Sequence, residues 1–326
     1  MSQGRPLEAP HRRPQTSSPR IVERTAIVGY KATAAVLAHV PPRLSEAVIG
    51  TAAQGSYLLW PAKRRFSNAN FGHVLGLPPE HPRVRRLALR AYREYARYVV
   101  ELMRLPSRPQ AELVAGVEDA GVDRLIADWR ASGRPMIVVA GHVGSNEAVG
   151  AALAGRGYPV SVIADDSSYP ELFELLSRQR EDWGVKIIAW RNLRGLYSVL
   201  KRKEILALLV DWGYRSDGIP VRLFGTWTTL PAGPAALAAK SGAMIAPLAI
   251  RRIGDGRVRV EPYETFTVPS SDPADIQRAT QRIADALESI IALAPEQWYS
   301  FKPMWPDDPA ETRALEARAT ALVASP

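Results

Sequence analysis

His142 is the side chain in this sequence whose type and position best suit acid–base chemistry. It follows an apolar run, 136–140, that is typical of a buried strand, and Gly141 and Gly144 flank it. In open α/β sheets, ligands bind beyond the carboxyl ends of the strands, where loops run into helices. An imidazole there can take a proton from a hydroxyl, provided that an acceptor holds its other ring nitrogen. We therefore expect His142 to act as a general base.

Two carboxylates are candidates for that acceptor. Glu147 lies five residues after His142, and the flanking glycines would let the turn fold back so that the two side chains meet. Asp211 follows the apolar run 205–210 and is expected at the same edge of the sheet. We rank Glu147 first and Asp211 second. Ser145 lacks the G-x-S-x-G surroundings of a nucleophile, so we expect it to cap the next helix.

Two further segments offer groups that could bind an anion. Arg180 lies near the end of a predicted helix, 169–183, and its planar guanidinium suits a phosphate. The segment 225–234 contains Gly225 and Gly233 and leads into a helix, whose free N–H groups could receive an anion or a developing oxyanion. A surface arginine and ordinary turn chemistry explain the same residues, so both alternatives stay open.

An alternation of strands and helices after residue 110 must position these groups. Continuous apolar or β-branched runs predict buried strands, and the segments between them have helical composition. The pattern predicts an α/β domain with a mostly parallel, mixed sheet covered by helices on both faces. The expected strands are 136–140, 160–164, 185–188, 205–210, 244–250 and 257–261. The expected helices are 145–155, 169–183, 192–203 and 273–293.

The chain is expected to comprise four regions. Residues 1–20 carry arginines without the apolar run of a signal peptide, and we expect a disordered basic tail. Residues 21–65 are apolar, but neither half reaches the ~20 residues that a bilayer span needs. We expect two helices that lie at a membrane interface or, alternatively, pack on the core. Residues 66–306 would form the α/β domain, and 307–326 a C-terminal helix or tail.

The segment 83–104 has the clearest helical periodicity in the sequence. On a helical wheel, one face is apolar or aromatic and is expected to pack on the core; it comprises Val84, Leu87, Ala91, Tyr95, Tyr98, Val99 and Leu102. The opposite face is a stripe of Arg83, Arg86, Arg90, Arg93, Arg97 and Arg104. We interpret the stripe as a surface for anionic lipid headgroups, with a solvated face as the alternative.

Composition limits the class of protein. Of the 326 residues, 46% are hydrophobic and 23% charged, values near those of soluble globular proteins and unlike those of a multi-span membrane protein. Cysteine is absent, which excludes disulfides, thiolate zinc sites and cysteine nucleophiles, and we expect the folded part inside the cell. The net charge of +9 predicts an anionic partner. No stacking platform or groove-reading motif accompanies it, so we expect no nucleic acid.

Four blocks of sequence, in order along the chain, resemble those of the lysophospholipid and lipid A biosynthesis acyltransferase family. The resemblance covers about residues 60–305 and is closest to its phosphatidylinositol-mannoside branch, with the lipid A branch second. The blocks are 141–147, which carries the HX4E pattern; Arg180 with Gly184; 209–211 with 221–225; and 230–235 with 240–243.

The resemblance implies a glycerol-phosphate-acyltransferase-like fold and a reaction at the cytoplasmic face of the plasma membrane. A fatty acyl group would pass from acyl-CoA or acyl-carrier protein to a hydroxyl of a glycolipid or phospholipid, with no metal and no further cofactor. Trp212, directly after Asp211, departs from the commoner family form. The implied catalytic residues are His142, Glu147 and Asp211, and the implied substrate-binding residues are Asn146, Arg180, Gly225 and Gly233.

Two other functions fit parts of the sequence. A peripheral lipid-binding protein would use the arginine stripe and the apolar N-terminal region, but it has no use for a histidine base with an orienting acid. A hydrolase would use His142 to activate water for attack on an ester. The order of the blocks favours acyl transfer over both.

Overall fold

The computed structural model describes residues 17–164, 170–254 and 256–324. Within these ranges, a central sheet has the order β1-β9-β8-β2-β5-β3-β4, with β10 beside β8. The strands β2, β3, β4, β5 and β8 run parallel, whereas β9 and β10 are antiparallel to β8. The strands are β1 (Val117–Asp119), β2 (Met136–Ala140), β3 (Val160–Ala164), β4 (Lys186–Ala189), β5 (Ile205–Leu209), β8 (Met244–Gly254), β9 (Arg257–Pro262) and β10 (Phe266–Thr267).

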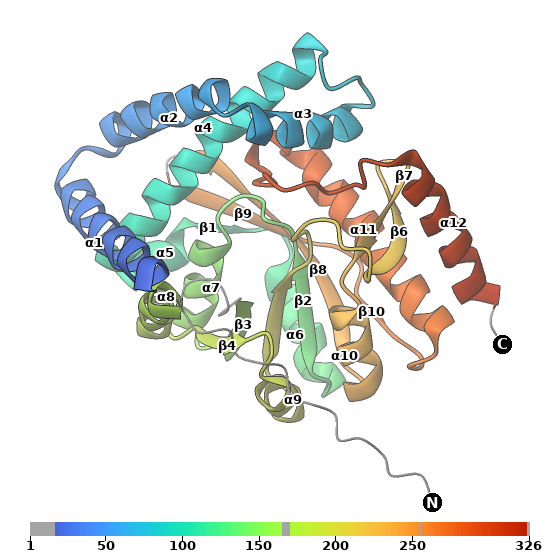
Figure 1. Ribbon diagram of the computed structural model, residues 1–326. Helices are drawn as coiled ribbons and strands as arrows, with labels where there is room; N and C mark the ends of the chain where they lie inside the picture. The colour runs from blue at the N-terminus through green and yellow to red at the C-terminus, as the bar shows by residue number, and fades with distance from the viewer. Residues whose placement is uncertain (1–16, 165–169, 255, 325–326) are drawn as a thin grey trace, which may run out of the picture.

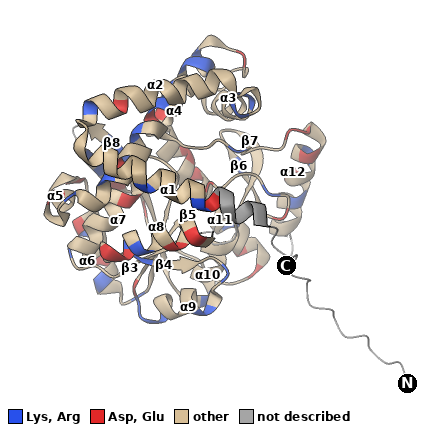
Figure 2. Cartoon of the chain, turned by 60° about the vertical axis from the view of Figure 1, so that its left-hand side comes forward, with Lys and Arg blue, Asp and Glu red and all other residues tan. Residues whose placement is uncertain are grey.

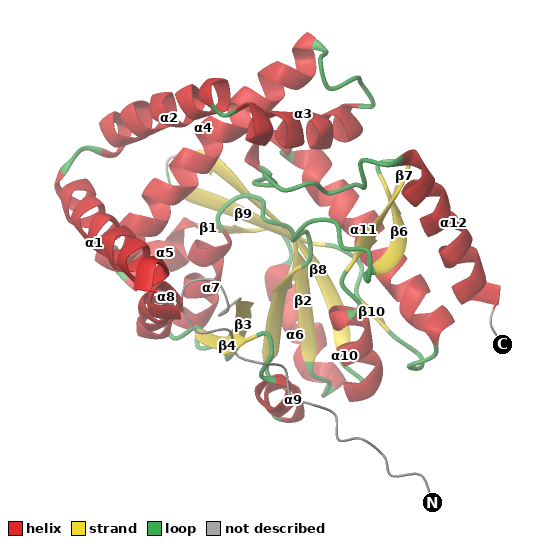
Figure 3. Cartoon of the chain, viewed as in Figure 1, coloured by secondary structure: helices red, strands yellow, loops and turns green. Residues whose placement is uncertain are grey.

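Helices cover both faces of this sheet (Figures 1 and 3). One hydrophobic cluster joins the sheet to α9, α10 and α11, and a second joins it to α5, α6 and α7. The helices are α1 (Ser17–His39), α2 (Pro42–Leu59), α3 (Pro61–Leu75), α4 (Pro82–Arg104), α5 (Gln110–Gly116), α6 (Val122–Ser132), α7 (Asn146–Gly155), α8 (Pro170–Asp182), α9 (Leu193–Lys201), α10 (Gly233–Ser241), α11 (Pro273–Leu293) and α12 (Pro309–Ala324).

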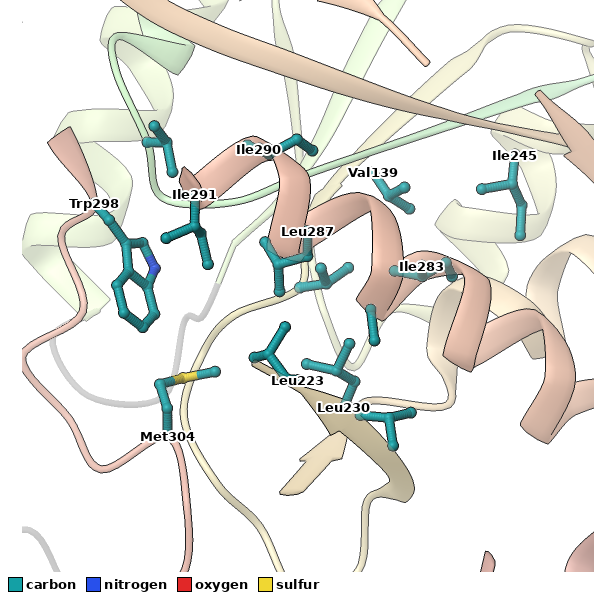
Figure 4. Close-up of a cluster of buried hydrophobic side chains, with 14 of the residues drawn as sticks. Val139, Leu223, Leu230, Ile245, Ile283, Leu287, Ile290, Ile291, Trp298 and Met304 are labelled. Carbon is teal, nitrogen blue, oxygen red and sulfur yellow. The ribbon is translucent and has the colours of Figure 1, made fainter. Parts of the chain in front are cut away.

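The strand β2 shows why its sequence is continuously apolar. Successive side chains of a strand point to opposite faces, so Ile137 and Val139 contact the first cluster, while Met136 and Val138 contact the second. All five residues of β2 are buried. Figure 4 shows Val139 beside the apolar face of α11. A strand that is covered on both faces is expected in a parallel sheet.

The α/β fold with a mostly parallel, mixed sheet is confirmed. The segments expected as strands are strands, with ends that differ by one residue for β4, β5 and β9 and by more at the end of β8. Several elements were not expected from the sequence, among them β1, β6, β10, α5 and α6. Residues 226–230, expected as part of a loop, form β7 (Thr226–Leu230), which pairs with β6 (Ile219–Leu223) in a separate hairpin. The hairpin packs on α11 through apolar side chains such as Leu223 and Leu230 (Figure 4).

The N-terminal region forms a layer of helices around α4 (Figure 1). Residues 1–16, most of the expected basic tail, lie outside the described residues, and α1 begins at Ser17. In the described part of the chain, no helix has both the length and the hydropathy required to cross a bilayer.

The burial of the two faces of α4 differs in two respects from that expected for the segment 83–104. Tyr95, placed on the core face, is 39% exposed, and the buried side is rotated toward Ala88, Tyr92 and Ala96. The arginine stripe is not uniformly solvated either, because α2 packs on it. Arg97 forms an ion pair with Glu46 of α2 at 3.1 Å. The remaining basic residues of α2, α3 and α4 lie in this same helical layer (Figure 2).

Candidate active site

His142 and Asp211 leave neighbouring strands at the same edge of the sheet. The strands β2 and β5 are parallel, and their register places Ala140 opposite Leu209. The N–H of Val210 donates to the carbonyl of Ala140 at 3.0 Å. The residues that follow the two strands are therefore adjacent, although 69 positions separate His142 from Asp211 in the sequence.

The Asp211 carboxylate holds both the backbone and the ring of His142. The imidazole Nδ1 lies 2.7 Å from Oδ1, and the backbone N–H of His142 donates to Oδ1 and Oδ2 at 3.0 and 2.9 Å. The indole N–H of Trp298 donates to Oδ2 at 2.8 Å. Because a carboxylate only accepts hydrogen bonds, Nδ1 carries the proton and Nε2 keeps its lone pair. This tautomer is the one that a general base requires.

Glu147 contacts a different partner from the one expected. Its Oε1 accepts a hydrogen bond from the guanidinium of Arg180 at 3.0 Å. The ranking of the two acids was therefore wrong: Asp211, not Glu147, contacts the ring of His142. The reason is that Glu147 already belongs to the first turn of α7 and faces α8, whereas Asp211 emerges from the adjacent strand.

Burial and charge act in opposite directions on this pair. Burial lowers the pKa of His142, but the charge and hydrogen bond of Asp211 outweigh it, and the pKa lies above its ordinary value of 6.5. Burial would raise the pKa of Asp211, but His142 and Trp298 stabilise the carboxylate and the pKa is lowered. Asp211 therefore stays ionised and would stabilise an imidazolium. The His142 side chain is still 32% exposed, so it is accessible to a substrate.

Arg180 and Glu147 form a second, mostly buried ion pair, with side-chain exposures of 20% and 14%. Tyr98 of α4 lies near it, and burial followed by the charge of Glu147 raises the pKa of this phenol well above 10. The hydroxyl of Tyr30 in α1 donates to Gln179, the neighbour of Arg180, at 3.1 Å. The N-terminal helices α1 and α4 therefore reach the residues that surround the site.

The loop that carries His142 is fixed by close packing and by Arg252. Gly144 has a φ of +72°, and a Cβ there would lie 2.3 Å from the carbonyl oxygen of Ile250. The buried Arg252 donates to the carbonyl of Gly144 at 3.1 Å and pairs with Glu94 of α4 at 2.7 Å. Glycine is therefore required at 144 by the approach of strand β8, and not by a turn that brings Glu147 to the ring.

Comparison with known proteins shows the family to which this chain belongs. The model of the bacterial lipid A biosynthesis acyltransferase family matches residues 13–306. This chain belongs to that family. A phosphatidylinositol mannoside acyltransferase of Mycolicibacterium smegmatis is 27% identical over 295 residues, which cover 88% of this chain and 93% of the relative. A protein of the same name from Mycobacterium tuberculosis is 25% identical over 260 residues, which cover 77% of this chain and 79% of the relative. The resemblance and the enzyme class are thereby confirmed.

The other residues expected to bind substrate in this acyltransferase lie in different settings. Asn146 donates to the carbonyl of Gly141 at 3.2 Å, and its Oδ1 is buried without a protein hydrogen bond in the described structure. Gly225 is exposed at the tip of the β6–β7 hairpin, where its φ of +73° suits a two-residue turn. Gly233 is exposed at the start of α10. Ser145 precedes α7 but its side chain makes no capping hydrogen bond.

Three further residues of the candidate site were given no role in the predictions from the sequence. Trp298 is one of them, and its indole N–H donates a hydrogen bond to Asp211. Arg252 could have been singled out from the sequence, because it is a charged residue that follows the apolar run of β8. Lys302 lies over the ring of Trp212, with its Nζ 3.5 Å from the centroid. Trp212 is half exposed, and its ring lies 6.1 Å from that of His142.

No group of acidic and histidine side chains within residues 17–164, 170–254 and 256–324 is arranged to hold a metal ion. At the candidate site, the groups suited to acid–base chemistry and binding are the imidazole, its orienting carboxylate, and the ion pair of Arg180 with Glu147.

Proposed function

We propose that this protein transfers a fatty acyl chain from an acyl-CoA or acyl-carrier-protein thioester to a hydroxyl of a glycolipid such as a phosphatidylinositol mannoside. The observation that carries the proposal is the contact of Asp211 with Nδ1 of His142, which directs Nε2 away from the carboxylate, together with the partial exposure of the His142 side chain. The names of the two relatives support the choice of acceptor.

The reaction needs one proton relay and no acyl-enzyme. The Nε2 of His142 takes the proton of the acceptor hydroxyl as its oxygen attacks the thioester carbonyl. The tetrahedral intermediate collapses, the C–S bond breaks, and the thiolate leaves with the proton from the imidazolium. An ester and a free thiol result. Asp211 holds the ring and stabilises its positive charge while the proton is on Nε2.

The buried oxygens beside His142 are suited to position the acceptor. Asn146 Oδ1 and Glu147 Oε2 have no hydrogen-bond partner in the described structure, and both oxygens are acceptors for hydroxyl donors. A sugar offers several hydroxyls, so one could react while others bind here. The Arg180 guanidinium would hold Glu147 in place and favour a nearby phosphate.

The protein would work at a membrane surface. Large apolar side chains are exposed on α1, on α2 and at the residue after α2, and contiguous patches of this kind mark interaction sites. They are Val28, Val36, Leu44, Val48, Leu58, Leu59 and Trp60, each between 56% and 85% exposed. Lys63, Arg64 and Arg65 follow directly in α3. Apolar insertion and attraction to anionic lipids together favour an interfacial position on the cytoplasmic face of the membrane.

A transfer assay with defined substrates tests this proposal. Palmitoyl-CoA and palmitoyl-acyl-carrier protein, each with a labelled acyl chain, would be offered with phosphatidylinositol mannoside, a lysophospholipid or a lipid A precursor. We expect label in the mannoside, identified by mass spectrometry. Label in another acceptor would contradict the acceptor assignment, and label released only as free fatty acid would identify a hydrolase.

A further inference from the structure

A groove of about 490 Å³ lies between α2 and α4, away from the strand ends that carry His142. Four arginines line it: Arg43 from α2, and Arg90, Arg93 and Arg97 from α4. Its volume suffices for a lipid headgroup, since small-molecule sites begin at roughly 300 Å³.

Part of the lining is neutralised within the protein. Arg97 pairs with Glu46 at 3.1 Å and with Glu94 at 3.2 Å. Glu94 in turn binds the buried Arg252 at 2.7 Å. This network joins α2, α4 and β8, and its carboxylates neutralise the charge of Arg97.

The other three arginines make the groove cationic. Among the described residues, no carboxylate oxygen lies within 4.0 Å of the guanidinium groups of Arg43, Arg90 or Arg93. Glu296 is the one acid of the described lining that stands outside the Arg97 network. Beyond the network of Arg97, Glu46 and Glu94, three guanidinium groups therefore share the groove with one further carboxylate, that of Glu296.

The position of Arg93 depends on a glycine in the facing helix. Gly50 of α2 is buried, and a Cβ there would lie 3.1 Å from Cγ of Arg93. The glycine lets the aliphatic stem of Arg93 pack between the helices while the charged end lines the groove. The packing of α2 on α4 thus builds the cationic lining.

Exposed apolar side chains adjoin the groove on the same helix. Arg43 and Ala47 line it, whereas Leu44 and Val48, which are 56% and 60% exposed, lie one residue further along and about 100° further around α2. A phospholipid with its chains beside Leu44 and Val48 could place its phosphate against the arginines. A free phosphate would gain nothing from the apolar stripe.

We propose that this groove binds the phosphate of an anionic membrane phospholipid, at a site distinct from the catalytic one. Guanidinium groups make charge-assisted, bidentate hydrogen bonds to phosphate oxygens. Arg252 separates the two sites, because it binds Glu94 on the side of the groove and the carbonyl of Gly144 on the side of His142. Binding of a phospholipid in this groove can be measured without acyl transfer, so the result does not depend on the mechanism proposed for His142.

Calorimetric titration with short-chain lipids tests the site without a bilayer. The probes are dihexanoylphosphatidylglycerol below its micelle concentration, dihexanoylphosphatidylcholine and inorganic phosphate. The variant Arg90→Gln/Arg93→Gln removes two unpaired charges from the groove. Arg83→Gln/Arg86→Gln is the matched control, since it removes two exposed charges from the same helix outside the groove. Circular dichroism and thermal melting check that each variant folds.

We expect the wild type and the control to bind phosphatidylglycerol with one-to-one stoichiometry, and the groove variant to bind it at least about tenfold more weakly. Ala47→Glu, at an exposed position of the lining, should weaken binding similarly by adding a carboxylate. Equal losses in the groove and control variants would show a diffuse charge effect and overturn the site. Inorganic phosphate that binds as tightly as the lipid would overturn the assignment to a phospholipid.

Discussion

The Asp211 carboxylate accepts hydrogen bonds from both the backbone N–H and the imidazole Nδ1–H of His142. One side chain thus fixes the position of the loop and the tautomer of the neutral imidazole. The parallel pairing of β2 with β5 makes this possible, because it brings the two strand ends together. Trp298 completes the environment of the carboxylate from the C-terminal part of the chain.

Replacing Asp211 by Asn should change the pH dependence of transfer. Only the neutral imidazole accepts a proton, so the rate falls as the pH drops through the pKa of His142. Asp211 raises that pKa, so its removal should move the acid limb of kcat/KM to lower pH. The rate at neutral pH should fall by about 10²- to 10⁴-fold, because the amide does not enforce the reactive tautomer. A pH profile with an unmoved acid limb would show that Asp211 does not act on His142.

The substitutions Glu147→Gln and Arg180→Gln should have non-additive effects on the kinetics of acyl transfer. The two side chains share a hydrogen bond at 3.0 Å, so removing either one leaves the other without its partner. We expect each variant to raise KM for the acceptor more than it lowers kcat. A double-mutant cycle should give a coupling of about 0.5–3 kcal/mol. Additive effects would place the two residues in separate roles.

Trp298→Phe should destabilise the protein and weaken the hold on Asp211. Phe keeps the contact of the fully buried ring with Phe71 but removes the indole N–H that donates to Asp211. We expect a loss of about 1–3 kcal/mol in the free energy of unfolding, measured by urea denaturation. If neither the free energy of unfolding nor kcat changed, this hydrogen bond would be dispensable.

Gly144→Ala should be strongly destabilising, with Gly233→Ala as its control. A methyl group at 144 would lie 2.3 Å from a backbone oxygen of β8 and would stand at a positive φ, so the loop that carries His142 must shift. A methyl group at 233 would meet no atom within 4 Å. We expect a fall of several degrees in Tm and loss of transfer for the first variant, and changes within about 0.5 kcal/mol for the second. Similar behaviour of the two variants would contradict the steric argument.

Much of the fold could be predicted because local patterns specify it. The run 136–140 is apolar at every position, as a strand covered on both faces must be, and the helix 273–293 shows a regular apolar spacing. The β6–β7 hairpin was missed because Pro220 and the glycines around it indicate a loop, and its pairing is decided by packing on α11. The exposure of the arginine stripe of α4 was misjudged because a helical wheel contains no information on α2, which packs on the stripe through the ion pair of Arg97 with Glu46.

The site was predicted less completely than the fold. His142 carries a local signal in its glycine-flanked loop, and Asp211 in the apolar strand before it. Sequence proximity favoured Glu147 as the partner of His142, but strand register decides such pairs, and register is a long-range property. Arg252 and Trp298 act through contacts with residues more than 80 positions away. Such contacts cannot be inferred from spacing along the chain.

Acyl transfer by His142→Ala tests the central claim most directly. Wild type and variant would be compared in single turnovers with labelled palmitoyl-CoA or palmitoyl-acyl-carrier protein and the acceptor that the wild type uses. Thermal melting would establish that the variant is folded, as expected for a partly exposed loop residue. We predict that transfer falls by at least about 10²-fold, while acceptor binding is retained. A folded variant that transfers the acyl chain at the wild-type rate would contradict the assignment of His142 as the general base.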